Sequence, residues 1–206
     1  MSESAPMNLS HHFLIAMPGL DDPSSFFARS VVYLCEHSER GALGLVINKP
    51  MAGIRLGGLL EKVELTLGRQ DLSDAPVFHG GPLQTERGFV LHDAMKPAHV
   101  GGAEDDGEAS PYASTMRIGG GLEMTTSKDV LEALSHGAGP RRVLVTLGYS
   151  SWGEGQLESE LAENSWLTVE ADPDLIFDAP VSERYDRALA LLGLQSWTLS
   201  PEAGRA

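Results

Sequence analysis

The stretch from Gly148 to Leu167, GYSSWGEGQLESELAENSWL, has the clearest structural pattern in the chain. The apolar run at 142–149 that leads into it has the length and the β-branched residues of a buried strand. Two glycines then permit a tight turn, and apolar residues one helical turn apart predict a helix over 156–164. A second strand is expected at 166–169. The stretch therefore predicts a strand, a turn, a short helix and a strand.

The aromatic residues of this stretch allow two interpretations. In the first, the turn is a binding corner, with Tyr149 and Trp152 as its walls and Gln156 and Glu158 as its polar groups. In the second, Trp152 and Trp166 fill the hydrophobic core. The four glutamates of the stretch are expected to spread over the remaining surface.

Further motifs run along the rest of the chain. They are FLIAMP at 13–18, DP at 22–23, Phe27, SVVYLCEH at 30–37, GALGLVINKP at 41–50, HGGP at 79–82 and RGFVLH at 87–92. With the tryptophan-containing stretch, their order and spacing resemble the YqgE/AlgH family of small bacterial proteins from about residue 9 to residue 194. The resemblance implies a bent sheet folded into a pseudo-barrel. Members of that family mostly have no assigned activity, and one branch is named for a regulator of alginate transcription.

The spacing of apolar residues indicates an α+β protein with a mixed sheet and flanking helices. Besides the elements of the first stretch, strands are expected at 12–17, 30–36, 42–47, 77–79 and 88–91, and helices at 54–65, 127–136 and 181–192. The short polar loop between the second and third strands predicts a hairpin. Strands clustered early and helices placed irregularly argue against a doubly wound parallel sheet.

The length of 206 residues suits one domain. We expect that domain to span 9–195, with a flexible N-terminus at 1–8 and a tail at 196–206. The segment 97–113 combines three glycines with four acidic residues, which predicts a mobile, solvated loop.

The composition limits the classes of function. The 29 acidic and 15 basic residues give a net charge of -14, and the basic residues form no cluster. Direct DNA binding is disfavoured, because duplex-binding proteins neutralise phosphates with basic patches. A regulatory effect through a protein partner is compatible with this charge. Since the chain lacks a membrane-length apolar stretch, a signal-peptide pattern and a second cysteine, we expect a cytoplasmic protein with no membrane partner.

Two motifs near the early strands could carry chemistry. In a regular strand Cys35 and His37 share one face while Glu36 faces away, so a reactive thiolate beside a histidine is geometrically allowed. The alternative is that Cys35 is a small core residue. Asn48 and Lys49 follow a strand with two glycines, but the spacing is wrong for a phosphate-binding P-loop. A proline-terminated turn is the preferred interpretation there.

A third motif combines His79, Gly80 and Gly81 with Arg87. The glycines could turn backbone amides toward an anion, and the arginine could hold a carboxylate or phosphate. The same residues equally make a tight turn. No histidine pair has the spacing of metal ligands, so neither a metal nor a cofactor is predicted.

These motifs together define a candidate functional surface. Its members are Glu36, His37, Asn48, Lys49, His79, Gly80, Gly81, Arg87, Tyr149, Trp152, Gly155, Gln156 and Glu158. No standard catalytic motif is present. The favoured hypothesis is therefore a regulatory or protein-interaction module that acts indirectly on gene expression. The alternatives are a small-molecule or nucleotide-binding enzyme of unassigned reaction, and a redox protein that depends on Cys35.

Overall fold

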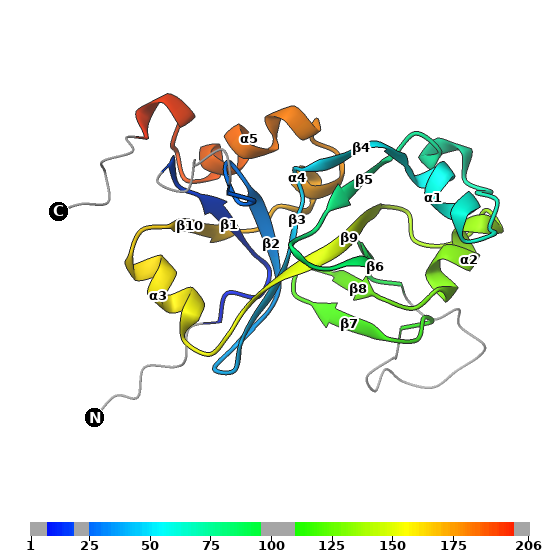
Figure 1. The fold of residues 1–206 in the computed structure, drawn as a ribbon, viewed down its shortest axis with the longest axis horizontal. Helices are drawn as coiled ribbons and strands as arrows, with labels where there is room; N and C mark the ends of the chain where they lie inside the picture. Colours follow the sequence, from blue (N-terminus) through cyan, green and yellow to red (C-terminus); the bar gives the residue numbers. More distant parts are fainter. Residues whose placement is uncertain (1–7, 19–24, 96–109, 200–206) are drawn as a thin grey trace.

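A computed structural model describes residues 8–18, 25–95 and 110–199. In these residues ten strands form one strongly curled, mixed sheet with helices around it (Figure 1). The predicted α+β class with a bent sheet is confirmed. Residues 1–7 of the predicted flexible N-terminus, most of the predicted loop at 97–113 and the end of the predicted tail lie outside the described residues.

The sheet has a continuous order of eight strands, with two more attached beside it. That order is β10 (Trp166–Glu170), β1 (His12–Ala16), β2 (Val31–Ser38), β3 (Gly41–Val46), β9 (Val143–Trp152), β6 (Leu83–Asp93), β8 (Leu122–Thr125) and β7 (Thr115–Ile118). The two others are β4 (Pro50–Arg55), which pairs with β5 (Pro76–His79). β2 and β3 form the predicted hairpin.

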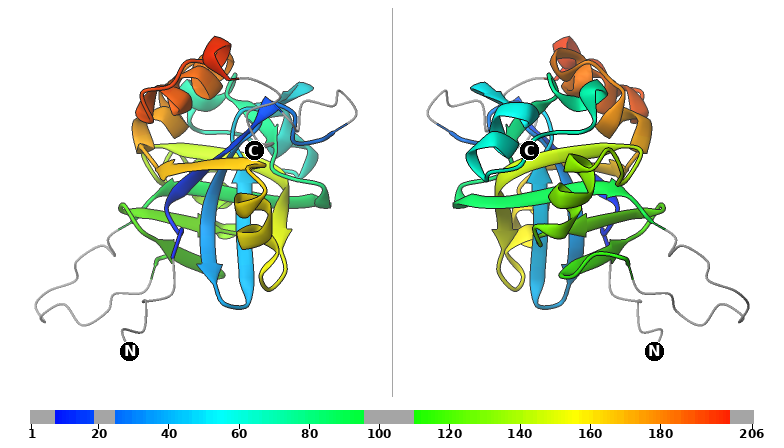
Figure 2. Two further views of the ribbon diagram at one scale, coloured as in Figure 1. Left: turned by 90° about the vertical axis from the view of Figure 1, so that its left-hand side faces the viewer. Right: turned by 90° about the vertical axis from the view of Figure 1, so that its right-hand side faces the viewer.

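The helices are short and cover separate parts of the sheet. They are α1 (Leu56–Lys62), α2 (Asp129–Ser135), α3 (Gln156–Ala162), α4 (Pro173–Phe177) and α5 (Arg184–Leu191). In Figure 1, α1 and α2 lie at one end of the molecule and α3 at the other, and Figure 2 shows α4 and α5 together along one side of the sheet. None of the helices within the described ranges is long and apolar enough to cross a membrane.

Strand β9 connects the two halves of the sheet. Its last residues, 150–152, pair with β3, while 145–147 pair in parallel with β5 on that same side. Its other side pairs with β6 in antiparallel register. β9 therefore runs from the half that contains β5 to β8 into the half that contains β1 to β3 (Figure 1).

The core lies on both faces of the sheet. On β1, Phe13 and Ile15 face a large cluster that α4 and α5 cover, while Leu14 and Ala16 face a second cluster beneath α3. A third cluster packs α1 and α2 against β5, β6 and β9. Burial on both faces explains the nearly continuous apolar runs of β1 and β2 in the sequence.

Some predicted elements differ from the structure. The predicted helix at 54–65 begins at Leu56, because the residues before it pair with β5 as strand β4. β6 is eleven residues long, and its first half is exposed and therefore lacks the apolar signal of a buried strand. β7, β8 and α4 were not predicted, since each has only four or five residues and no clear periodicity of its own.

The chain crosses β9 at Gly80 and Gly81. The Gly80 amide donates to the Leu147 carbonyl, and the Gly80 carbonyl accepts from the Val46 amide at 2.8 Å. A Cβ atom on Gly80 would lie 2.2 Å from the Gly148 carbonyl oxygen, and one on Gly81 would lie 2.1 Å from the Tyr149 carbonyl. The Gly80–Gly81 segment thus lies against the backbone of β9, next to the end of β3, and leaves no room for a side chain at either position.

We expect Gly81→Ala to destabilise the protein by at least about 2 kcal/mol, because the methyl group would overlap backbone that cannot move aside. Urea unfolding followed by circular dichroism measures the change. Gly58→Ala is the matched control, since a Cβ there meets nothing within 4 Å. That helical substitution should be neutral or stabilise by about 0.5–1 kcal/mol. Equal midpoints for Gly81→Ala and the wild type would contradict the crossing geometry.

Candidate functional site

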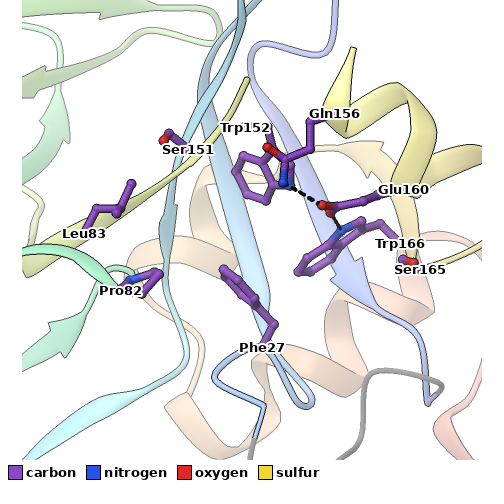
Figure 3. Close-up of a pocket in the computed structure, with 9 residues that line it drawn as sticks. All are labelled: Phe27, Pro82, Leu83, Ser151, Trp152, Gln156, Glu160, Ser165 and Trp166. Atoms are coloured by element: carbon purple, nitrogen blue, oxygen red, sulfur yellow. Dashed lines mark hydrogen bonds between the residues drawn. The ribbon is translucent and has the colours of Figure 1, made fainter. Parts of the chain in front are cut away.

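A groove of about 350 Å³ lies beside the end of β9 (Figure 3). α3 forms one wall, the chain that leaves the Gly80–Gly81 crossing forms another, and the segment before β2 contributes an aromatic ring. The lining residues are Phe27, Pro82, Leu83, Ser151, Trp152, Gln156, Glu160, Ser165 and Trp166. Its walls therefore come from four separate parts of the sequence. We call it the Trp152 groove.

A glycine turn positions α3 against this groove. Gly155 precedes the helix with φ +69°, a left-handed conformation that favours glycine. The Gln156 side chain accepts a hydrogen bond from the Gly153 amide at 3.0 Å and closes the turn. The chain thereby reverses after Trp152, and the first turns of α3 pack back onto the end of β9.

The Glu160 carboxylate is at the centre of the groove's polar network. Its Oε2 atom accepts from the indole N–H of Trp152 at 2.9 Å and from that of Trp166 at 2.7 Å. Its Oε1 atom accepts from the Gln156 amide at 3.0 Å. The prediction that all four glutamates spread over the surface is wrong for Glu160, which is half-buried. Two buried indoles need an acceptor, and this carboxylate supplies it.

Three aromatic rings of the groove pack against one another, and two of them contact this carboxylate. The Phe27 ring centroid lies 5.4 Å from that of Trp166 and 6.3 Å from that of Trp152, and the two indoles are 6.0 Å apart and nearly perpendicular. Both tryptophans are only 4% exposed, which confirms that they belong to the core. The edges that they expose also line the groove, so the two interpretations of Trp152 are compatible.

His37 and Glu158 form a separate link beneath α3. The His37 Nδ1 atom accepts from the Leu9 amide at 3.0 Å, so the proton of the neutral ring is on Nε2. Nε2 then donates to the Glu158 carboxylate at 2.8 Å. The pair therefore ties the start of the chain, β2 and α3 together. The other Glu158 oxygen is buried and has no hydrogen-bond partner within the described parts of the chain.

The pairing of Cys35 with His37 that a regular strand would allow is not formed, and the alternative, that Cys35 is a core residue, is confirmed. A β-bulge between Leu34 and Glu36 shifts the register of β2. Cys35 consequently faces the large core cluster, while His37 points to the opposite face toward α3. Burial, and secondarily the charge of Glu36, raises the pKa of the Cys35 thiol well above its ordinary value. A reactive thiolate is not supported.

Asn48 and Lys49 have backbone contacts typical of a structural turn. The Asn48 side chain accepts from the Val31 amide at 2.9 Å and donates to the Arg29 carbonyl at 2.8 Å. The side-chain amide of Asn48 thus makes the hydrogen bonds that the backbone of a neighbouring strand would make at the start of β2. The Lys49 carbonyl accepts from the His79 amide, and its ammonium lies 5.6 Å from the Phe26 ring centroid.

The remaining candidates are dispersed. His79 is half-buried at the end of β5, and Glu36 is exposed on β2. Arg87 lies on an exposed part of β6, over the Phe89 ring. Its guanidinium donates to the side chains of Gln84 and Thr126. The Tyr149 ring also packs on Phe89, 5.3 Å away, and therefore belongs to the large core cluster.

The structure thus brings together only part of the predicted surface. Trp152 and Gln156 line the groove, and Gly81 directly precedes the lining residue Pro82 in the chain. Sequence reasoning missed the other lining residues of the groove, which are Phe27, Pro82, Leu83, Ser151, Glu160, Ser165 and Trp166. One available signal was the i, i+4 spacing of Gln156 and Glu160, placed between two indoles that both require an acceptor.

The fold and the groove define a small α+β protein with an aromatic corner beside a curled sheet. A family model described as AlgH-like matches residues 13–197. The chain therefore belongs to the AlgH-like family.

Several relatives resemble the whole chain. It is 75% identical to a UPF0301 protein of Paracidovorax citrulli, over 100% of this chain and 99% of that one. It is similar to the AlgH protein of Pseudomonas aeruginosa, known from a solution structure, with 45% identity, a TM-score of 0.72 and complete coverage of both chains. A crystal structure of a Corynebacterium diphtheriae protein shares the fold, with a TM-score of 0.65, 20% identity and coverage of 92% and 88%.

We expect Glu160→Ala to lower the free energy of unfolding by roughly 2–4 kcal/mol, because two buried indole N–H groups lose their acceptor. Urea unfolding followed by tryptophan fluorescence measures this loss. Glu163→Ala is the matched control on the same segment, where the side chain is exposed, and should stay within about 0.5 kcal/mol of the wild type. Equal effects of the two substitutions would contradict the role of Glu160.

The Glu158 link should be sensitive to acid. A hydrogen bond from the Glu158 backbone amide is the main cause that lowers the pKa of the Glu158 carboxyl below the ordinary 4.5. Partial burial opposes this shift, and the contact with His37 adds to it. A carboxyl of this kind contributes stability above its unfolded pKa and loses that contribution as the pH falls through the folded pKa. Glu158→Gln should therefore be less stable than the wild type at pH 7, with the difference shrinking below about pH 4.5. Urea unfolding from pH 7 to pH 3 measures it, and a difference that stays constant across this range would refute the assignment.

Proposed function

We propose that this protein is a cytoplasmic protein-interaction module that acts indirectly on gene expression, and that the Trp152 groove is its docking site. The observation that carries the proposal is the exposed apolar wall of the groove. Leu83 is 40% exposed there, next to Pro82 and opposite the aromatic rings. Aromatic side chains with a polar rim are typical of a protein interface, and the exposed leucine adds apolar surface beside them.

The regulatory part of the proposal rests on the family and on charge. One branch of the family is named for regulation of transcription. A net charge of -14 disfavours contact with the phosphates of DNA. Binding of another protein is then the route by which such a protein would influence gene expression.

A second candidate function is binding of a small molecule in the same groove. Its volume of about 350 Å³ is in the range of small-ligand sites. The described residues that line it include two serines and one carboxylate but no histidine, cysteine or lysine. A reproducible thermal shift with one class in a panel of nucleotides and metabolites would favour this candidate.

Site-specific crosslinking tests the docking site. A photo-crosslinking amino acid is placed at position 83 in the groove or at position 191, because Leu191 on α5 is similarly exposed at 42%. We expect position 83 alone to give a covalent adduct with a protein that mass spectrometry identifies. That protein, purified, should bind Leu83→Asp at least tenfold more weakly than the wild type, and Leu191→Asp normally. Equal binding of both variants, or no adduct specific to position 83, would exclude the groove as the docking site.

A further inference from the structure

We infer that the Trp152 groove binds an arginine side chain of its protein partner. This inference rests on the proposed function and specifies the chemistry that the partner presents. It depends on three properties of the groove: a carboxylate whose hydrogen-bond donors among the described residues are all neutral, the aromatic walls beside it and the absence of a cation among the described lining residues.

The carboxylate has room for one more hydrogen bond. Of the described residues that line the groove, Glu160 is the only ionisable one. Its Oε2 atom already accepts two indole N–H groups, and its Oε1 atom accepts one from Gln156. The two oxygens of a carboxylate together offer about four acceptor positions. One position therefore remains on Oε1, and none of the described residues that line the groove supplies a counter-ion for the negative charge.

The aromatic walls fit the flat cation of arginine. Figure 3 shows Phe27, Trp152 and Trp166 turned toward one space, with the Glu160 carboxylate at its edge. A guanidinium stacks on aromatic rings and is less strongly hydrated than the ammonium of lysine. Of the three rings, half-buried Phe27 is the most open one, since both tryptophans are only 4% exposed. It can donate to a carboxylate oxygen from the edge of its plane while its face rests on a ring.

The surroundings of the groove add negative charge. Glu154 before α3 and Glu163 after it are both exposed, and the whole chain has a net charge of -14. No lysine or arginine belongs to the described lining. Lys49 lies over Phe26, outside the lining set. This field attracts a basic segment and repels an acidic one.

The apolar side of the groove favours a segment of a protein over a free cation. Pro82 and Leu83 lie across from the aromatic rings, beyond the reach of the carboxylate network (Figure 3). They would contact the residue that neighbours the arginine in the partner. A lone guanidinium would leave that wall exposed to water.

Peptide binding to the full-length protein tests the inference. The probes are three acetylated and amidated pentapeptides, Gly-Ala-X-Leu-Gly, in which X is arginine, lysine or citrulline, the neutral analogue of arginine. The readout is the set of indole N–H signals in a ¹⁵N–¹H correlation spectrum, with the signal of exposed Trp197 identified from Trp197→Phe. We expect the arginine peptide to shift the Trp152 and Trp166 signals and to leave Trp197 unchanged. Relative to the arginine peptide, the citrulline peptide should bind about tenfold more weakly and the lysine peptide several-fold more weakly.

A variant provides a second measurement. Glu160→Gln keeps an acceptor for the indoles and removes the charge, so it should reduce the preference for arginine over citrulline to about twofold or less. Because the citrulline comparison uses the unaltered protein, the test holds even where this variant folds poorly. Equal binding of the arginine and citrulline peptides, equal binding of the lysine peptide, or no shift at Trp152 and Trp166 would overturn the inference.

The two proposals fail in different ways. If Leu83→Asp weakens binding of the crosslinked partner but the arginine peptide shows no preference, the groove is a docking site and only the arginine assignment is wrong. If Leu83→Asp leaves the partner bound, the docking site itself is wrong, whatever the peptides show.

Discussion

The close contact between the Gly80–Gly81 backbone and strand β9 is the constraint on which the rest of the structure depends. β3 and β5 both pair with the same side of β9, one antiparallel and one parallel, and the chain must pass between them. Two glycines allow the main chain to lie where any side chain would overlap the backbone of Gly148 and Tyr149. This passage divides the sheet into two halves and permits its strong curl. It also directs Pro82 and Leu83 toward the end of β9, where they form one wall of the groove.

A single carboxylate combines structure and recognition at the other wall. Glu160 holds two buried indoles in place and orders Gln156 at the start of α3. Its negative charge is tolerated because three N–H groups solvate it, as water would in an open site. A site of this kind is rigid, because the same hydrogen bonds that position Trp152 and Trp166 also fix the charge between them. Rigid aromatic side chains lose little conformational entropy when a partner binds.

Much of the fold could be predicted from the sequence, and less of the site. The α+β class, the β2–β3 hairpin and the strand, turn, helix and strand around Trp152 follow from apolar periodicity and glycine placement, which are local signals. The bulge at Cys35 could not be predicted, since a bulge depends on the register of a partner strand. Gly80 looked equally suited to an anion site or to a turn, because local sequence does not show which backbone groups meet it. Phe27 joins the groove only through the tertiary fold.

The strand order also has a consequence for how the chain folds during synthesis. β1 to β3 are complete by residue 46, yet their neighbours β9 and β10 begin only at Val143 and Trp166. While the ribosome makes the intervening hundred or so residues, the early strands form a small meander with two open edges. Closure of such distant pairs is slow, because the connecting chain loses much entropy. The nascent chain therefore exposes apolar strands until translation is almost finished, and chaperones that shield such edges should affect its yield more than its final stability.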